Sequence, residues 1–114
     1  MRKILYFLIV RYLLTPIMIR ARENGGNYWD EIIVDKLKRK YLVHLPVGYS
    51  NIKDKKFPVI IYYHGGGGKP TSSLIETKLG LLANREKCIV VFPKGYKKSW
   101  ADARCGTVAS KAGI

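Results

Sequence analysis

The chain has 114 residues, which is one domain at most and too short for most complete large-enzyme folds. Its hydrophobic fraction of 47% and charged fraction of 25% are ordinary for a globular protein, so disordered, collagen-like and low-complexity classes are excluded. Lys and Arg number 21 against 8 Asp and Glu, which gives a formal net charge of +13 at pH 7. Composition alone therefore favours a nucleic-acid or anionic-membrane partner.

The N-terminal segment changes how that charge is interpreted. Residues 1–22 contain five basic residues and no acid, and an apolar run at residues 4–10 follows a basic start, as in a secretory signal peptide. Arg11 interrupts the apolar stretch, and the charge-free runs of 7 and 8 residues are short of the roughly 20 that a membrane-spanning helix needs. We interpret residues 1–22 as an export signal or an uncleaved anchor, with a soluble element or a misplaced start as the remaining alternative. Export would place the protein outside the cell or in the periplasm, and an anchor would place it on a membrane.

The two cysteines make no disulfide framework. Cys88 begins an apolar run and is expected to be a buried small hydrophobe, whereas Cys105 lies in a loop-like stretch. A bridge between the two stays open as an alternative for an exported protein.

Residues 23–114 have the pattern of the opening of an α/β protein. Residues 28–34 and 40–45 are β-rich, and the turn signal at Asp35 and Lys36 between them predicts a β-hairpin or meander. Residues 57–63 are continuously apolar, β-branched and aromatic, which is typical of a strand buried on both faces.

A helix and a further strand follow. Leucines and isoleucines at helical spacing predict a helix over residues 73–83, and Ser73 with Glu76 has the spacing of a capping box at its start. Residues 88–92 are again apolar and predict a buried strand that ends at Pro93. Strand, helix and strand form a βαβ unit, whose crossover is expected to be right-handed.

The most specific chemical feature is a glycine loop at the end of the predicted strand 57–63. Four glycines follow His64 directly: Gly65, Gly66, Gly67 and Gly68. Ligands of open α/β sheets bind at the carboxyl ends of strands, and consecutive glycines let main-chain N–H groups approach a reacting oxygen. A flexible loop or a phosphate cradle is the alternative, but the G-x-x-x-x-G-K-[ST] spacing of a phosphate cradle is absent. The pattern favours half of an oxyanion hole, in which one donor contributes about 2.7–4 kcal/mol to transition-state stabilisation.

Three stretches carry a specific resemblance. Residues 58–68, residues 88–93 and residues 99–105, the last reading Ser-Trp-Ala-Asp-Ala-Arg-Cys, resemble the N-terminal part of the polyhydroxybutyrate depolymerase-like esterases. These enzymes belong to the α/β-hydrolase superfamily and are related to feruloyl and acetylxylan esterases. Residues 39–49 resemble the strand that opens their domain. The resemblance implies a serine carboxylic-ester hydrolase that acts on a polyester or a plant cell-wall ester, without a cofactor or metal.

The resemblance also implies roles for individual residues. Main-chain N–H groups near Gly66 and Gly67 would supply the first oxyanion donors, and His64 would orient the loop and would not be the catalytic base. Three further residues would lie on the segment that approaches the active-site mouth: Trp100, Asp102 and Arg104. Their alternative role is structural, with an Asp–Arg pair holding a loop above the packed tryptophan.

The catalytic triad of that superfamily is not found in this sequence. It contains no G-x-S-x-G elbow, and no histidine follows His64. We therefore expect a partial esterase domain over residues 23–114 that is truncated before the nucleophile strand and inactive alone. The strand at residues 57–63 should pair with residues 88–92 on one side and leave its other edge open.

Two non-catalytic alternatives remain. Lysines alternate with aromatic residues in residues 36–41, 53–57 and 94–100, as in modules that bind single-stranded nucleic acid. Each cluster falls in a predicted turn or loop, where solvated charge is the default, so no specific nucleic-acid partner is expected. The second alternative is a small membrane-anchored binding protein that contacts the membrane only through residues 1–22.

Overall fold

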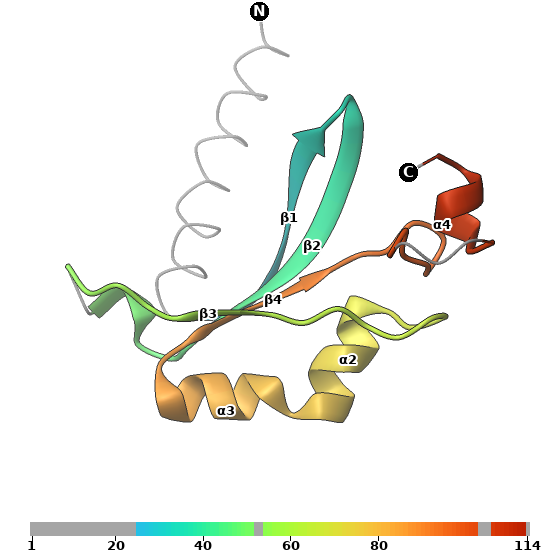
Figure 1. The fold of residues 1–114 in the computed structure, drawn as a ribbon. Coiled ribbons are helices and arrows are strands. Elements are labelled where there is room, and N and C mark those ends of the chain that lie inside the picture. Colours follow the sequence, from blue (N-terminus) through green and yellow to red (C-terminus); the bar gives the residue numbers. More distant parts are fainter. Residues whose placement is uncertain (1–24, 52–53, 103–105, 114) are drawn as a thin grey trace, which may run out of the picture.

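The computed structural model describes residues 25–51, 54–102 and 106–113 (Figure 1). The expected export signal or anchor at residues 1–22 lies outside these ranges. The elements in chain order are β1 (Gly26–Val34), β2 (Leu37–Leu45), the 3-10 turn η1 (Tyr49–Asn51), β3 (Val59–Ile61), α2 (Pro70–Thr77), α3 (Leu79–Glu86), β4 (Ile89–Pro93) and α4 (Val108–Lys111). None of the helices in the described ranges has both the length and the apolar character needed to cross a membrane.

The predicted hairpin is present and is longer than the sequence pattern indicated. β1 and β2 are antiparallel, and Val34 lies opposite Leu37 across a two-residue turn. Asp35 and Lys36 both have positive φ angles, 50° and 62°, as a type I′ turn requires. Because this tight turn lets the pairing continue to its base, β2 begins at Leu37 and not at residue 40. The basic cluster at residues 36–41 therefore lies mostly on a strand, and its assignment to a loop was wrong.

The four strands of the described chain form one sheet in the order β1-β2-β4-β3 (Figure 1). β1 pairs with β2 and β2 with β4 in antiparallel fashion, whereas β3 and β4 are parallel, with Val59 beside Ile89. The connection between these parallel strands runs through α2 and α3, as the predicted βαβ unit requires. β3 lies at the sheet edge and pairs with β4 alone in the described ranges, which confirms the predicted pairing.

The single helix predicted over residues 73–83 is two helices. Pro70 starts α2 at its first position, where a missing N–H costs nothing, and the chain breaks at Lys78, which has a left-handed φ of 54°. Ser73 is therefore inside α2, and its hydroxyl donates back to the carbonyl of Lys69 at 3.0 Å. The capping box that Ser73 predicted does not exist, and the Thr77 hydroxyl instead accepts from the Leu79 N–H at the start of α3.

The core lies between the sheet and the two connecting helices. Its buried members are Leu42, Ala83, Cys88, Val90 and Phe92, with Ile60, Tyr62, Leu74 and Leu79 packed against them. Cys88 is a buried free thiol, as expected, so the alternative bridge to Cys105 is not formed; Cys105 itself lies outside the described residues.

The opposite face of the sheet carries exposed apolar side chains. Val59 and Ile61 of β3 are 56% and 55% exposed, so the prediction that this strand is buried on both faces was wrong. The reason is that α2 and α3 lie on the same side of the sheet (Figure 1). The apolar run at residues 57–63 therefore predicted burial correctly only for the face of β3 that packs against α2 and α3.

Candidate functional site

The glycine loop begins where the chain leaves β3. Beyond Ile61 the backbone stays alongside β4, because the Tyr62 N–H donates to the Val91 carbonyl at 2.9 Å. This pairing carries His64 to the carboxyl end of β4, next to Gly95. The loop therefore lies at the carboxyl end of the parallel strands, where ligands of open α/β sheets bind.

The four glycines form one tight turn. The Gly68 N–H donates to the Gly65 carbonyl at 2.9 Å, and Gly67, the third residue of the turn, has a φ of +78°. These are the features of a type II turn, which needs glycine or asparagine at that position. A Cβ on Gly68 would lie 3.0 Å from the Gly65 carbonyl oxygen and 3.0 Å from the His64 Cβ. The turn therefore requires glycine at position 67 because of its positive φ, and at position 68 because a side chain there would have no room.

His64 is buried beneath this turn, and both of its ring nitrogens are occupied. The Gly95 N–H points to Nε2 at 3.3 Å, so Nε2 accepts. Nδ1 must then carry the proton, and it donates to the Gly65 carbonyl at 2.8 Å. The imidazole thus links residue 65 of the glycine loop to residue 95 after β4, and neither nitrogen is left to take a proton from a nucleophile.

A second loop, residues 94–99, supports the first. The Gly67 N–H donates to the Lys98 carbonyl at 2.9 Å, and the Ser99 N–H closes the second loop on the Tyr96 carbonyl at 2.9 Å. Gly95 has no room for a side chain, since a Cβ would lie 2.7 Å from the Ser99 carbonyl oxygen. The sequence placed both residues in a basic cluster at 94–100 but did not assign Gly95 or Lys98 a part in supporting the glycine loop, although a glycine two residues after the end of a buried strand was a usable signal.

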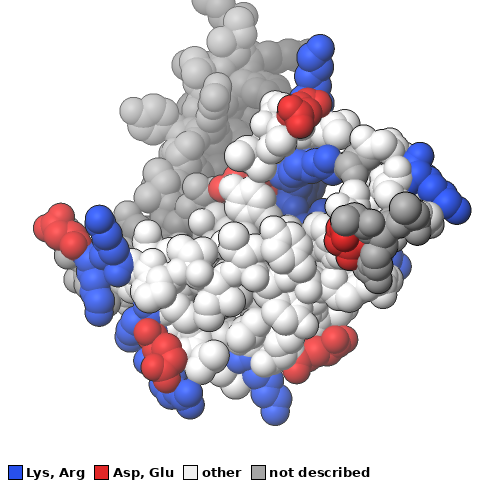
Figure 2. All heavy atoms as spheres, in the orientation of Figure 1, with Lys and Arg blue, Asp and Glu red and all other residues white. Residues whose placement is uncertain are grey.

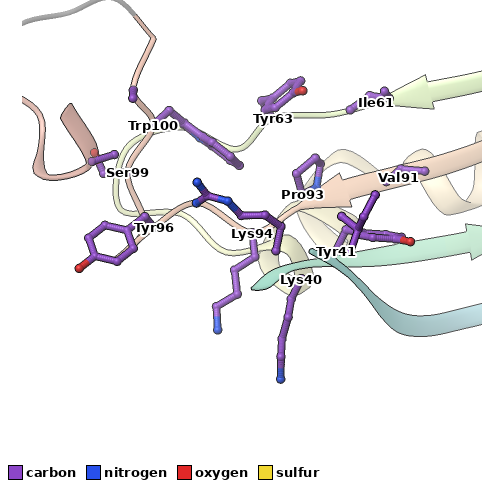
Figure 3. Close-up of a pocket in the computed structure, with 14 residues that line it drawn as sticks. Lys40, Tyr41, Ile61, Tyr63, Val91, Pro93, Lys94, Tyr96, Ser99 and Trp100 are labelled. Carbon is purple, nitrogen blue, oxygen red and sulfur yellow. The ribbon is translucent and has the colours of Figure 1, made fainter. Parts of the chain in front are cut away.

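Trp100 fixes the start of the glycine loop. Its indole Nε1–H donates to the His64 carbonyl at 2.7 Å, and its ring lies 4.8 Å from the His64 ring and 5.1 Å from the Tyr63 ring. Figure 3 shows Trp100 and Tyr63 facing one another. Asp102 is exposed, and the expected pair with Arg104 lies outside the described residues.

The glycine loop offers a free main-chain donor. The amides of Gly67 and Gly68 are used within the site, whereas the Gly65 and Gly66 amides have no hydrogen-bond partner among the described residues. Nothing lies within 4 Å of the position that a Cβ on Gly66 would take, so this part of the turn is open to a ligand. Of the two donors expected from the resemblance, only the Gly66 amide is available in this arrangement.

An apolar cavity of about 400 Å³ adjoins the loop on the face opposite α2 and α3 (Figure 3). Tyr63 and Trp100 form the wall nearest the glycine loop, and Ile61, Val91 and Pro93 continue it along the strands. Its volume falls in the range of small-molecule sites. The described residues contain no cluster of side chains that could hold a metal ion.

Comparison with solved structures finds partial likenesses to α/β-hydrolases. A ferulic acid esterase matches with a TM-score of 0.53 and 22% identity over 62% of this chain and 30% of its own. An S-formylglutathione hydrolase from Agrobacterium tumefaciens matches with a TM-score of 0.53 and 16% identity over 70% and 28%. The S-formylglutathione hydrolase from Staphylococcus aureus matches with a TM-score of 0.54 and 18% identity over 72% and 35%. No family model matches the sequence, and no curated protein matches it significantly.

The fold is therefore that of part of an α/β-hydrolase. The chain spans about a third or less of the length of these three neighbours. At sequence identities of 16–22%, this likeness concerns the fold alone.

Proposed function

We propose that this chain forms the oxyanion-loop part of a serine carboxylic-ester hydrolase, in the branch of polyhydroxybutyrate depolymerase-like, feruloyl and acetylxylan esterases. The observation that carries the proposal is the type II glycine turn at the carboxyl end of β3, whose Gly66 amide has no partner among the described residues. Tyr63 and Trp100, which contact each other and adjoin His64, line an apolar cavity next to this turn. The partial likeness to a ferulic acid esterase adds support for an ester substrate.

In this proposal the Gly66 amide stabilises negative charge. When a serine oxygen attacks the ester carbonyl, the carbonyl oxygen gains the charge of the tetrahedral intermediate, and a preorganised N–H donor there contributes about 2.7–4 kcal/mol. His64 and Trp100 act as positioning residues, because they hold the loop through backbone atoms of residues 64, 65 and 95. The apolar cavity beside Trp100 would receive the acyl group.

The remaining catalytic groups are not in this sequence. It has no G-x-S-x-G elbow and no histidine after His64, so the nucleophile and the base would be supplied by other residues of a longer or second chain. The 114-residue chain alone would show no turnover of p-nitrophenyl acetate that a serine-directed inhibitor abolishes. Such turnover would contradict the proposal.

The decisive test separates the Gly66 amide from the shape of the loop. Proline is favoured at the second position of a type II turn, so Gly66→Pro removes the N–H and keeps the turn, whereas Gly66→Ala keeps both. In the esterase assembled with its nucleophile-bearing part, Gly66→Pro should lower kcat by about 100–1000-fold with a much smaller change in KM. Retention of kcat by Gly66→Pro within threefold of Gly66→Ala would refute the role of this amide.

Export is a separate part of the proposal. A cleaved segment 1–22 would yield a secreted or periplasmic enzyme, whereas an uncleaved one would leave it on a membrane. Fractionation of the full chain and of a chain without residues 1–22 distinguishes these outcomes. Membrane retention that the deletion abolishes would replace the secreted location with the anchored one.

A further inference from the structure

A basic groove lies beside the glycine loop and shares Arg39, Lys40 and Lys94 with the lining of the apolar cavity. It consists of two adjoining hollows of about 320 Å³ and 300 Å³, which share Lys94 and Gly95. Six cationic residues line it that have no ion pair within the described part of the chain: Arg39, Lys40, Lys69, Lys94, Lys97 and Lys98. Among the described residues, no Asp or Glu lines either hollow. On the face drawn in Figure 2, Lys and Arg side chains gather in a hollow at the upper right.

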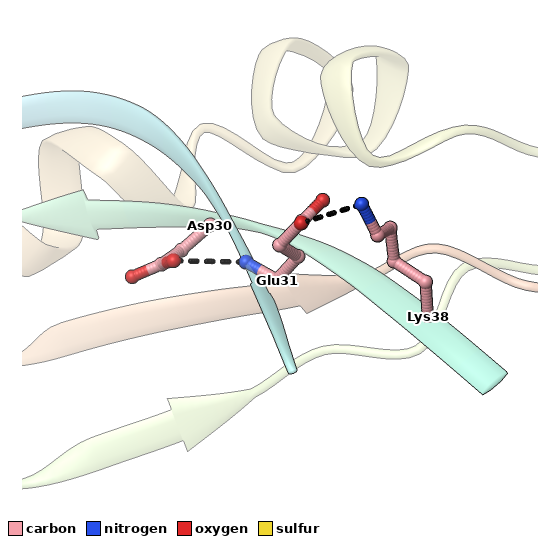
Figure 4. A network of polar contacts seen from close by, with 3 residues as sticks. All are labelled: Asp30, Glu31 and Lys38. Atoms are coloured by element: carbon pink, nitrogen blue, oxygen red, sulfur yellow. Dashed lines mark hydrogen bonds and ion pairs between the residues drawn. The ribbon is translucent and has the colours of Figure 1, made fainter. Parts of the chain in front are cut away.

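The charges of this groove are largely uncompensated. Lys38 also lines it, but its ammonium is paired with Glu31 at 2.9 Å across the hairpin (Figure 4). In the described residues the only other ion pair is between Arg85 and Glu86, away from the groove. Clustered like charges repel one another, and a bound anion would relieve that repulsion.

Backbone contacts fix the groove to the glycine loop. The Lys98 carbonyl accepts from the Gly67 N–H at 2.9 Å, and the Gly95 N–H points to His64. Lys97 and Lys98 both have positive φ angles, 44° and 63°, a conformation that costs a non-glycine residue about 1 kcal/mol or more. Figure 3 shows the ammonium groups of Lys40 and Lys94 projecting to the same side, away from the apolar wall of the neighbouring cavity. A polyanion held by these groups would therefore lie against the glycine turn, at His64 and Gly68.

We infer that the basic groove binds the substrate and that this substrate is an acidic polysaccharide carrying an ester group. The inference rests on the proposed function, and it adds the chemistry of the substrate's polymer part. Two hollows of this size exceed what one carboxylate fills, so several charged sugar units would be bound in series. Five of the six cations are lysines, whose compact charges on flexible stems can each meet a single charge along a polymer, and Arg39 adds the planar fork that binds a carboxylate bidentately.

Nucleic acid fits the same groove less well. Proteins that bind single strands stack bases on free aromatic faces. Here the Lys97 ammonium lies over the Tyr96 ring at 5.6 Å from its centroid, and the Trp100 ring packs against His64 and Tyr63. These contacts engage Tyr96 and Trp100 and leave Trp29, which is 46% exposed, as the aromatic face in the hollow that contains Lys69 and Lys94. One such ring offers a stacking surface for a single base, whereas single-strand binders stack successive bases on several.

The test is a binding titration of the full 114-residue chain with fluorescein-labelled oligogalacturonate at about 50 mM salt, where the Debye length still exceeds 10 Å. The groove variant is Lys40→Gln/Lys69→Gln/Lys94→Gln, since these lysines have ordinary backbone angles and no ion pair. The matched control, Lys55→Gln/Lys56→Gln/Lys111→Gln, removes the same charge from residues that do not line the groove.

We expect the groove variant to bind at least about tenfold more weakly and the control variant to bind within twofold of the native chain. Methyl-esterified, neutral oligogalacturonate should not bind measurably. Equal losses in both variants, no binding by the native chain, or tighter binding of an oligothymidylate of equal charge would each overturn the inference.

This titration measures binding without hydrolysis, so it is independent of the esterase assay. Normal binding together with an active Gly66→Pro enzyme would refute the oxyanion role of the Gly66 amide, while the conclusion that the groove binds an acidic polysaccharide would stand. Absent binding together with the expected Gly66→Pro defect would refute the acidic substrate and leave the esterase proposal intact.

Discussion

Replacing Gly95 with alanine is the most direct test of how the two loops are joined. An added Cβ would lie 2.7 Å from the Ser99 carbonyl oxygen, 3.1 Å from the Ser99 nitrogen and 3.3 Å from the His64 Cε1. Ordinary contact begins at 3.4 Å, so the Ser99 carbonyl would have to move by about 0.7 Å. Backbone atoms cannot rotate away as a flexible side chain does, and the Ser99 N–H is already held by the Tyr96 carbonyl at 2.9 Å.

The expected cost has two parts. Overpacking of this kind costs about 1–3 kcal/mol. The movement would also lengthen the Gly95 N–H contact to His64, which is 3.3 Å in the native chain, and an unpaired buried group costs about 1–3 kcal/mol. Together they should lower the free energy of unfolding by about 2–6 kcal/mol. Gly66→Ala is the matched control, because nothing lies within 4 Å of its Cβ and its φ is not positive, so it should be neutral or stabilise by up to about 1 kcal/mol.

Urea unfolding followed by tryptophan fluorescence is the suitable assay, since Trp100 packs against His64 and reports on this site. With a denaturant slope of about 2 kcal/mol per molar, the midpoint of Gly95→Ala should fall by about 1–3 M. Two results would refute the reasoning: an unchanged midpoint in Gly95→Ala, or a larger fall in Gly66→Ala than in Gly95→Ala.

Three further substitutions test the site and the fold. Trp100→Phe keeps a ring against Tyr63 but removes the donor to the His64 carbonyl, so thermal unfolding should show a loss of about 1–2 kcal/mol; no loss would mean that water replaces the indole N–H. Lys36→Gly relieves the positive φ of 62° in the hairpin turn, and the melting temperature should rise by an amount that corresponds to about 1 kcal/mol; a fall would contradict the type I′ assignment. Phe92→Ala empties a fully buried position and should cost about 3–5 kcal/mol in urea unfolding, whereas a cost below about 1 kcal/mol would show that the core is not packed as described.

The sequence predicted the features that depend on local patterns. Alternating and continuous apolar runs located all four strands, and Asp35 with Lys36 located the hairpin turn. The glycines after His64 located the loop at the carboxyl end of β3, because they directly follow the apolar run that forms this strand.

What the sequence could not predict depends on partners distant in the chain. The break falls at Lys78, a residue type that favours helix, while the nearby Gly80 lies inside α3, and Ser73 has the same spacing to Glu76 whether it caps a helix or lies inside one. An apolar run cannot say how many faces of its strand are covered, which is why Val59 and Ile61 were assigned to the core. The hydrogen bond from the Gly67 amide to the Lys98 carbonyl joins residues 31 positions apart, and neither composition nor periodicity indicates it.

The loop at residues 94–98 serves two purposes through different atoms. Its main chain holds the glycine turn, through the Gly95 N–H and the Lys98 carbonyl, while the side chains of Lys94, Lys97 and Lys98 point to the groove. Charge in the groove and the shape of the glycine turn therefore depend on different atoms of the same segment. In the proposed esterase, a variant that exchanges these lysines for neutral or acidic residues would change which polymer the groove attracts and leave the backbone contacts of the glycine turn intact.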